Sequence, residues 1–399
     1  MHFFQTENIL FQKMAFFNKK TSKISFFYKK TYQEKLEELK NFANLTEQDI
    51  FELKNLAQLS FGTADKMVEN VISTIQIPLG IATNFLINKK NYLVPMATEE
   101  PSVIAAASNG AKLARFSGGF TATSTQPIMI GQIQIINIKN IKEIKSKILQ
   151  NKNFLLKLAN KQDIFLQKLG GGAINLKLKT LKTNRCNMLI VNLFVNVKDA
   201  MGANIINTML EKIAPEIEKI TNHKILLKII SNLSIYRMAK AKAVWKKEIL
   251  GQDTIENILD AYEFAKIDIF RTVTHNKGIM NGIDAVALAT GNDFRAIEAG
   301  AHGYACYKKK YAPLTHYYKN KNQDLVGKIY LPIPVGTIGG ITNIHPSAKL
   351  SLKILGAKSA CELSQIMASV GLAQNFAALK ALVTDGIQKG HMTLHKRKL

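Results

Sequence analysis

The chain has 399 residues, which is long enough for more than one hydrophobic core and predicts two domains. Apolar residues make up 47% and charged residues 21%, as in a globular protein, which excludes extensive disorder. The three cysteines, Cys186, Cys306 and Cys361, form no spaced pair; this excludes a disulfide framework and a zinc site and indicates a reducing, cytoplasmic setting.

The net charge of +25 comes from 54 basic and 29 acidic residues. It fits a nucleic-acid or anionic-lipid surface, a lysine-rich composition without functional meaning, or a surface that steers phosphate-bearing ligands. The lysines are scattered among abundant isoleucine and asparagine, and no clustered basic face with interleaved aromatic residues is visible. This distribution favours the second interpretation and predicts no nucleic-acid partner.

Residues 1–26 are rich in phenylalanine and lysine, and Glu7 is their only acidic residue. They lack the apolar core and cleavage site of a secretion signal. We therefore expect a poorly ordered N-terminal extension.

Two short helices are predicted over 32–57. Leu36, Leu39 and Phe42 recur every third residue and mark one apolar side. Thr46, followed by Asp49 three positions later, is a loose capping box at the start of the second helix.

Two uncharged stretches, 70–88 and 116–138, raise the question of a membrane helix. Both are interrupted by several polar residues and glycines, whereas a membrane helix needs about 20 predominantly apolar residues. We predict no membrane partner.

Glu100 precedes Pro101 and an alanine-rich stretch over 102–115 that is predicted to be a helix. Proline is favoured at the first helical position, so Glu100 is expected at the mouth of this helix. A carboxyl group there is a candidate proton donor or acceptor. Glutamates before prolines at helix starts are also common without any function.

Residues 126–231 differ from the rest of the chain in their pattern of predicted strands and helices. The pattern predicts a strand at 132–138, a lysine-rich helix to Leu169, strands at 174–180 and 188–197, a helix at 199–220 and a strand at 225–230. This β-α-β-β-α-β order is that of a ferredoxin-like domain. We predict an α+β protein in which this small domain is inserted into a large, mainly helical one.

The segment Asp199-Ala200-Met201-Gly202-Ala203-Asn204 opens the second predicted helix of this domain. Small residues at a helix N-terminus let a phosphate approach the backbone. The alternative is an ordinary helix start capped by Asp199. No GxGxxG motif follows a strand, which argues against a Rossmann site.

Lys277 lies in the stretch His-Asn-Lys-Gly-Ile-Met-Asn-Gly, among apolar residues and glycines. A desolvated ammonium group can polarise a carbonyl and stabilise an oxyanion. A surface lysine with a buried stem is the alternative.

Asp293 follows Lys277 by sixteen residues, within Gly-Asn-Asp-Phe-Arg. Asn292 or Asp293 can cap the helix that follows. If a turn separates two packed helices, Asp293 can instead meet Lys277 and keep it charged.

His391 lies near the end of the chain, in Gly-His-Met-Thr-Leu-His. Histidine transfers protons near neutral pH, although many terminal histidines are inert.

In this order, the motifs around Glu100, Asp199, Lys277, Asp293 and His391 resemble bacterial-type, class II 3-hydroxy-3-methylglutaryl-CoA reductases. The resemblance runs from about Phe27 to Leu399. It implies a large substrate domain at 27–125 and 232–390 and a small nicotinamide-binding domain at 126–231. The implied reaction interconverts 3-hydroxy-3-methylglutaryl-CoA and mevalonate plus CoA, with two NAD(H), through a hemithioacetal and mevaldehyde.

The resemblance also implies catalytic roles. Lys277 would polarise the thioester carbonyl, Glu100 would supply a proton, Asp293 would link the two, and His391 would protonate the departing CoA thiolate. Two effects oppose each other at Glu100. A helix N-terminus and a nearby lysine lower the pKa of a carboxyl group, whereas a proton donor needs a raised pKa, which burial can provide.

Binding residues are implied in the same way. The positions that match substrate-binding residues are Ser102, Asn232, Arg271, Thr274 and Asn281. The cofactor would meet Asp199–Asn204 and Asp163, whose carboxylate would hold the ribose hydroxyls and repel a 2′-phosphate, so NAD is expected rather than NADP and no metal is expected. Family members are homodimers or larger assemblies with sites across the interface, and 69–74 is expected in that contact.

The resemblance has one large departure. The chain ends eight residues after His391, where the family continues into a flap that closes over the site, so 391–399 is expected to be a stub of the flap. One hypothesis is an active reductase whose flap is shortened or separately encoded. The other is a catalytically weak remnant that folds, dimerises and binds CoA or NAD.

Overall fold

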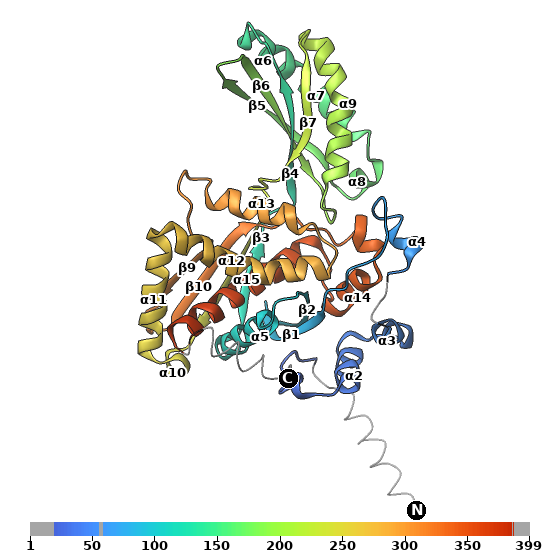
Figure 1. Ribbon diagram of the computed structural model, residues 1–399. Helices are drawn as coiled ribbons and strands as arrows, with labels where there is room; N and C mark the ends of the chain where they lie inside the picture. The colour runs from blue at the N-terminus through green and yellow to red at the C-terminus, as the bar shows by residue number, and fades with distance from the viewer. Residues whose placement is uncertain (1–19, 56–58, 385, 387–399) are drawn as a thin grey trace, which may run out of the picture.

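The computed structural model describes residues 20–55, 59–384 and 386. Two β-sheets, each with its own hydrophobic core, divide these residues into a large body and a small body (Figure 1). The small body is the continuous segment 128–231, and the large body contains the described residues before and after it. The mixture of helices and largely antiparallel sheets confirms the α+β class.

The large body is built on a six-stranded sheet in the order β2-β1-β3-β8-β10-β9. Its strands are β1 (Leu79–Ile87), β2 (Lys90–Ala97), β3 (Phe120–Ser124), β8 (Met238–Trp245), β9 (Thr315–Lys319) and β10 (Leu325–Pro332). Neighbouring strands are antiparallel except β1 and β3, which are parallel and pair at Ile87 and Phe120. The side chain of Asn88 extends this short ladder, because its amide exchanges two hydrogen bonds of 2.9 Å with the backbone of Ala122.

The expectation of a mainly helical large domain understated this sheet. Strand β8 has the sequence Met-Ala-Lys-Ala-Lys-Ala-Val-Trp, and alanine and lysine are not typical strand formers. Its alanines are small enough to fit beneath the helices that cover the sheet, so tertiary packing decides the conformation.

Helix α15 (Ala360–Val383) is the central helix of the large body. It packs against α12 (Ile269–Ala289), α5 (Val103–Ala114) and the sheet, where Phe376 stacks on Trp245 with ring centroids 3.8 Å apart. Within the described ranges, α15 is the one helix long and apolar enough to cross a membrane, but 72% of its most apolar window is buried inside the protein. It is therefore accounted for as a core helix.

Shorter helices complete the large body. They are η1 (Phe27–Lys29), η2 (Arg115–Ser117), α10 (Lys247–Leu250), α11 (Gln252–Ile267), α13 (Phe294–Ala305), η3 (Gly340–Asn343) and α14 (Pro346–Leu355).

The N-terminal helices α2 (Tyr32–Ala43), α3 (Glu47–Lys54) and α4 (Phe61–Ala64) lie at one side of the large body (Figure 1). The first two confirm the two predicted helices. Thr46 and Asp49 form a full capping box, since each side chain accepts a hydrogen bond from the other residue's backbone N–H. Leu36, Leu39 and Phe42 are buried in a small core against α14.

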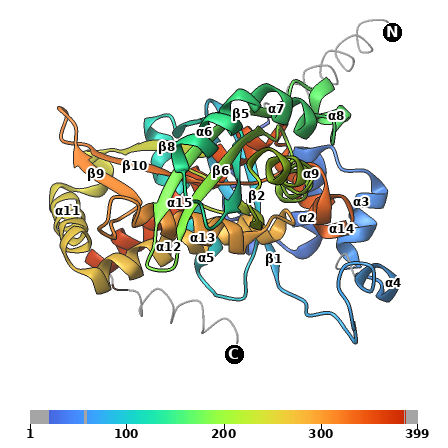
Figure 2. The ribbon, with the colours of Figure 1, turned by 90° about the horizontal axis from the view of Figure 1, so that it is seen from above.

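The small body contains a four-stranded antiparallel sheet in the order β5-β6-β4-β7. Its elements are β4 (Ile128–Ile135), α6 (Ile141–Gln150), α7 (Lys152–Asn160), α8 (Ile164–Lys168), β5 (Gly172–Lys182), β6 (Asn187–Asn196), α9 (Ala203–Thr221) and β7 (Ile225–Ser231). The helices cover one face of the sheet (Figure 2). The predicted order of elements is present, with the single lysine-rich helix divided into three.

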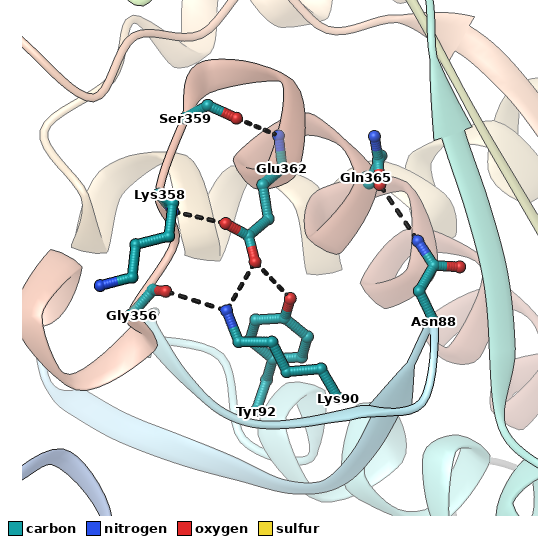
Figure 3. A network of polar contacts seen from close by, with 8 residues as sticks. All are labelled: Asn88, Lys90, Tyr92, Gly356, Lys358, Ser359, Glu362 and Gln365. Carbon is teal, nitrogen blue, oxygen red and sulfur yellow. Dashed lines mark hydrogen bonds and ion pairs between the residues drawn. The ribbon is translucent and has the colours of Figure 1, made fainter.

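The first turn of α15 is fastened to β2 by a polar network (Figure 3). The carboxylate of Glu362 accepts hydrogen bonds from Lys90 Nζ at 2.7 Å and from the Tyr92 hydroxyl at 2.6 Å. Burial alone would raise the pKa of Glu362, but these donors hold it below its usual range. The network fixes the N-terminus of α15, which also meets the small body.

Candidate active site

Glu100 and Lys277 are 177 positions apart in sequence and form an ion pair. Lys277 Nζ donates a hydrogen bond to Glu100 Oε2 at 3.1 Å. Glu100 lies in the turn before α5, and Lys277 projects from the middle of α12; the exposed fractions of their side chains are 38% and 60%. The pair is therefore an accessible acid and base at the surface of the large body.

Three further predicted residues share the Lys277 side of α12. Arg271, Thr274 and Asn281 are spaced at intervals of three to seven residues, so they project within about a third of a turn around the helix axis. Arg271 is half-buried, and burial lowers the pKa of its guanidinium group. Its guanidinium group makes no hydrogen bond or ion pair with another described residue.

Ser102 and Asn232 lie on loops. Ser102 is the N-cap residue of α5 and has a left-handed backbone, with φ of 77°. Because the helix begins at Val103, Pro101 precedes the cap, and the prediction that it occupies the first helical position was wrong. Asn232 is exposed in the connection between β7 and β8.

Asp293 is the N-cap residue of α13, and its Oδ1 accepts a hydrogen bond from the N–H of Ala296 at 3.1 Å. Arg295 Nη2 is 3.5 Å from the same oxygen. Lys277 precedes Ala289, the last residue of α12, by twelve residues, which is about 18 Å of helix. Among the described residues Asp293 and Lys277 share no hydrogen bond or ion pair, since Lys277 lies in the middle of α12 and Asp293 at the start of α13.

The segment Asp199–Asn204 lies at the edge of the small body that faces Asp293. Helix α9 begins at Ala203, with Gly202 as its left-handed N-cap residue (φ of 100°), so the prediction that the helix starts at Asp199 was wrong. A side chain at position 202 would meet Val197, which explains the glycine. Asp199 instead accepts a hydrogen bond from the N–H of Ala360, at the start of α15, at 2.8 Å.

A cavity of about 1370 Å³ joins this segment to Asp293. Its walls on the small-body side are formed by the six residues from Ala200 to Ile205. Across from them lie largely apolar N-terminal side chains, among them Tyr28, Tyr32, Leu36 and Leu39. Neither Glu100 nor Lys277 lines the cavity. The predicted residues therefore fall into two groups. The Lys277 group comprises Glu100, Arg271, Thr274, Lys277 and Asn281, and the Asp293 group comprises Asp293 and residues 199–204.

Asp163 is the N-cap residue of α8 in the small body, and its Oδ1 accepts a hydrogen bond from the N–H of Leu166 at 2.8 Å. It does not line the cavity. His391 lies outside the described residues. Among residues 20–55, 59–384 and 386, no group of His, Cys, Asp or Glu side chains is arranged to hold a metal ion.

Sequence reasoning assigned no role to Arg295 or to the buried side of α12. Arg295 belonged to the motif around Asp293 and could have been noticed as its adjacent cation. Beneath Lys277, buried His275 shares a hydrogen bond of 2.6 Å with Thr315, and Thr315 donates to Asn375 of α15. Burial lowers the pKa of His275 to about 3, so this histidine is neutral and holds α12 in place.

The sequence was compared with known proteins. The family model described as hydroxymethylglutaryl-coenzyme A reductase matches residues 31–396. The 3-hydroxy-3-methylglutaryl-coenzyme A reductase of Archaeoglobus fulgidus is 53% identical over 380 residues, which cover 95% of this chain and 87% of that protein. A probable enzyme of the same name from Borreliella burgdorferi is 37% identical over 386 residues, covering 94% and 85%.

A solved structure of a protein with the same name has a closely similar fold. The class II 3-hydroxy-3-methylglutaryl-CoA reductase of Streptococcus pneumoniae, bound to NADPH in open conformations, has a TM-score of 0.87 and 42% identity, covering 90% of this chain and 99% of that one. By fold and sequence, the protein is an oxidoreductase of the α+β class that these enzymes represent. It belongs to the 3-hydroxy-3-methylglutaryl-coenzyme A reductase family and is closely related to the bacterial and archaeal class II enzymes.

Proposed function

We propose that the protein interconverts 3-hydroxy-3-methylglutaryl-CoA and mevalonate plus CoA, using two NAD(H). The observation that carries this proposal is the 3.1 Å contact between Lys277 and Glu100, with the half-buried cation of Arg271 on the same side of α12. It combines an electrophile for a carbonyl oxygen, a proton donor and a binding group for a carboxylate on one side of α12.

Lys277 has the central role in this reaction. Its ammonium group polarises the thioester carbonyl and then stabilises the oxyanion of the hemithioacetal. Glu100, already hydrogen-bonded to Lys277, supplies the proton that the aldehyde oxygen of mevaldehyde takes up. His391 protonates the CoA thiolate, which prevents its return to the aldehyde.

Arg271 binds the free carboxylate of the substrate. A half-buried guanidinium group without a partner in the described chain favours a bidentate carboxylate ligand. Thr274 and Asn281 flank Lys277 by about one helical turn on either side and contact the hydroxyl and nearby groups. Ser102 and Asn232 complete this substrate-binding set.

The residues around α9 fit a nicotinamide dinucleotide. Gly202, Ala203 and Asn204 at the start of this helix line the cavity, and the N–H groups of a helix start can receive a pyrophosphate. When bound, the nicotinamide supplies the hydride. Asp163 favours NAD, because a carboxylate near the ribose repels a 2′-phosphate. The small body (128–231) is thus the ferredoxin-like nicotinamide-binding domain inserted into the substrate domain.

A complete site requires a second subunit. Lys277 projects from the middle of α12 and Asp293 caps the next helix, α13, with no contact between them among the described residues. Asp293 of one subunit therefore meets the Lys277 group of the other in a symmetric homodimer. Four apolar side chains are strongly exposed: Ile72 (95%) and Ile75 (94%), of which Ile75 lines the cavity with Asp293, and Phe270 (83%) and Ile267 (75%) where α11 meets α12. Such side chains are typical of a protein–protein interface.

The test is thioester-dependent oxidation of NADH and NADPH by the purified full chain, beside Lys277→Ala. We expect turnover by the wild type and a loss of at least about a hundredfold in kcat in the variant. Lys266→Ala is the matched control, because Lys266 forms a comparable exposed ion pair with Glu263 on α11. Nucleotide binding without turnover by the wild type would overturn the proposal in favour of the catalytically weak remnant.

A further inference from the structure

Arg237 is the most deeply buried arginine near the Asp293 group, with 5% of its surface exposed. It lies in the turn before β8, and no carboxylate of the described chain forms an ion pair with it. Its guanidinium group instead donates hydrogen bonds to the carbonyl oxygens of Ala200 at 3.0 Å, Met201 at 3.1 Å and Val335. Burying a charge is costly, so its placement among three carbonyl groups calls for an explanation.

Two of these carbonyl groups belong to the segment that precedes α9. The rest of that segment is also held by the large body: the N–H of Thr337 donates to the Asp199 carbonyl at 2.9 Å. Gly336 packs directly on it, since a Cβ atom there would lie 2.7 Å from the backbone nitrogen of Met201. The segment is therefore clamped between Arg237 and residues 335–337.

The same clamp reaches the neighbour of Asp293. The N–H of Gly336 donates to Asn292 Oδ1 at 2.7 Å, and Asn292 is buried. A chain of contacts thus runs from Arg237 through Gly336 to the residue beside Asp293. A shift of the Arg237 guanidinium group would move the start of α9 relative to Asp293.

We propose that Arg237 is a positioning residue for the dinucleotide site, which fixes Ala200 and Met201 so that the N-terminus of α9 is aligned with Asp293. The proposal rests on the proposed function, because it assumes that the start of α9 receives the dinucleotide. A planar guanidinium group is needed because one side chain must reach carbonyl groups on two separate segments. A lysine at this position retains the charge but cannot span both.

The variants are Arg237→Met and Arg237→Lys in the full chain, with Arg115→Met as a matched control. Arg115 is also partly buried and donates to a carbonyl oxygen, that of Asn84, at 3.1 Å, but it lies between α5 and the β1–β2 hairpin, away from the proposed site residues. The readouts are Tm, the Kd of NADH from its own fluorescence, and the KM of each substrate.

We expect Arg237→Met to raise the Kd and KM of NADH on the order of tenfold to a hundredfold, with the KM of the thioester within about twofold of wild type. Arg237→Lys should restore Tm more than NADH binding. Arg115→Met should lower Tm without this split between the two substrates.

Wild-type NADH binding by Arg237→Met, or the same split in Arg115→Met, would overturn the proposal. If Arg237→Met does not fold, wild-type NADH binding by folded Arg237→Lys overturns it. A wild type that binds NADH without thioester reduction defeats the proposed function alone, since the Kd comparison still tests Arg237. A wild type that binds neither NADH nor NADPH defeats both.

Discussion

The Lys277 group and the Asp293 group are different kinds of site. In the Lys277 group, Lys277 and Glu100 are long, exposed side chains whose ion pair is open to water. In the Asp293 group, Asp293 caps α13 beside a clamp made mostly of buried backbone groups around Gly336 and Arg237. Exposed ion pairs contribute little to stability, whereas buried hydrogen-bonded groups are costly to disturb. The Lys277 group can therefore be altered without unfolding, whereas a change in the Asp293 group alters both ligand binding and stability.

The largest effect on activity should follow removal of the Glu100 carboxyl group from the Lys277 group. Glu100→Gln keeps the size of the side chain but replaces the carboxyl group by an amide, which cannot donate a proton to the aldehyde oxygen. We expect kcat to fall on the order of a hundredfold to ten thousandfold. Tm should stay close to wild type because the ion pair is exposed. Glu99→Gln, one residue away, is the control. Equal kcat values for Glu100→Gln and wild type would remove the catalytic role.

A smaller effect is expected at Asp163 in the small body. Asp163→Asn removes the charge but keeps a good N-cap acceptor for the N–H of Leu166. The preference for NADH over NADPH, measured as the ratio of their kcat/KM values, should fall about tenfold, or 1.4 kcal/mol. An unchanged ratio would show that Asp163 does not choose the cofactor.

A mixed dimer tests whether Lys277 of one subunit meets Asp293 of the other. Lys277→Ala and Asp293→Asn chains should each be nearly inactive, and random mixing should restore about a quarter of wild-type activity, because half the dimers are mixed and each has one intact site. Activity of the mixture is measured after co-expression with two affinity tags. If both residues act from the same subunit, mixing restores nothing.

The smallest expected effect is on the pH dependence of stability, through the buried His275 on α12. The folded-state pKa of His275 is lowered to about 3, below the unfolded value near 6.5, so the unfolded state binds the proton first. The stabilising contribution of His275 is therefore present above pH 6.5 and is lost as pH falls toward 3. Burial raises the pKa of Asp284, which acts in the opposite sense.

Because of Asp284, the informative quantity is the difference between wild type and His275→Gln. Urea unfolding at a series of pH values should show the variant losing less stability than wild type between pH 7 and 4. Parallel curves for the two proteins would contradict a buried neutral histidine.

The sequence by itself determined features that depend on near neighbours. The capping box of Thr46 and Asp49, the apolar side of α2 and the order of elements in the small body follow from spacing within one or two turns or strands. The motifs around Glu100 and Lys277 were also visible, because their residue types are unusual for their surroundings.

Only the tertiary structure decided which distant segments meet. It made β8 a central strand despite its alternating alanine and lysine, paired Asp199 with the N–H of Ala360 in α15 rather than with the start of α9, and brought Arg237 to Ala200 and Met201. It also separated Lys277 from Asp293, because about 18 Å of helix lies between Lys277 and the end of α12 and Asp293 caps the next helix, although sixteen positions had allowed them to meet. The physical reason is that local spacing is set by the helix and strand periods, whereas long-range contacts are set by the packing of the whole core.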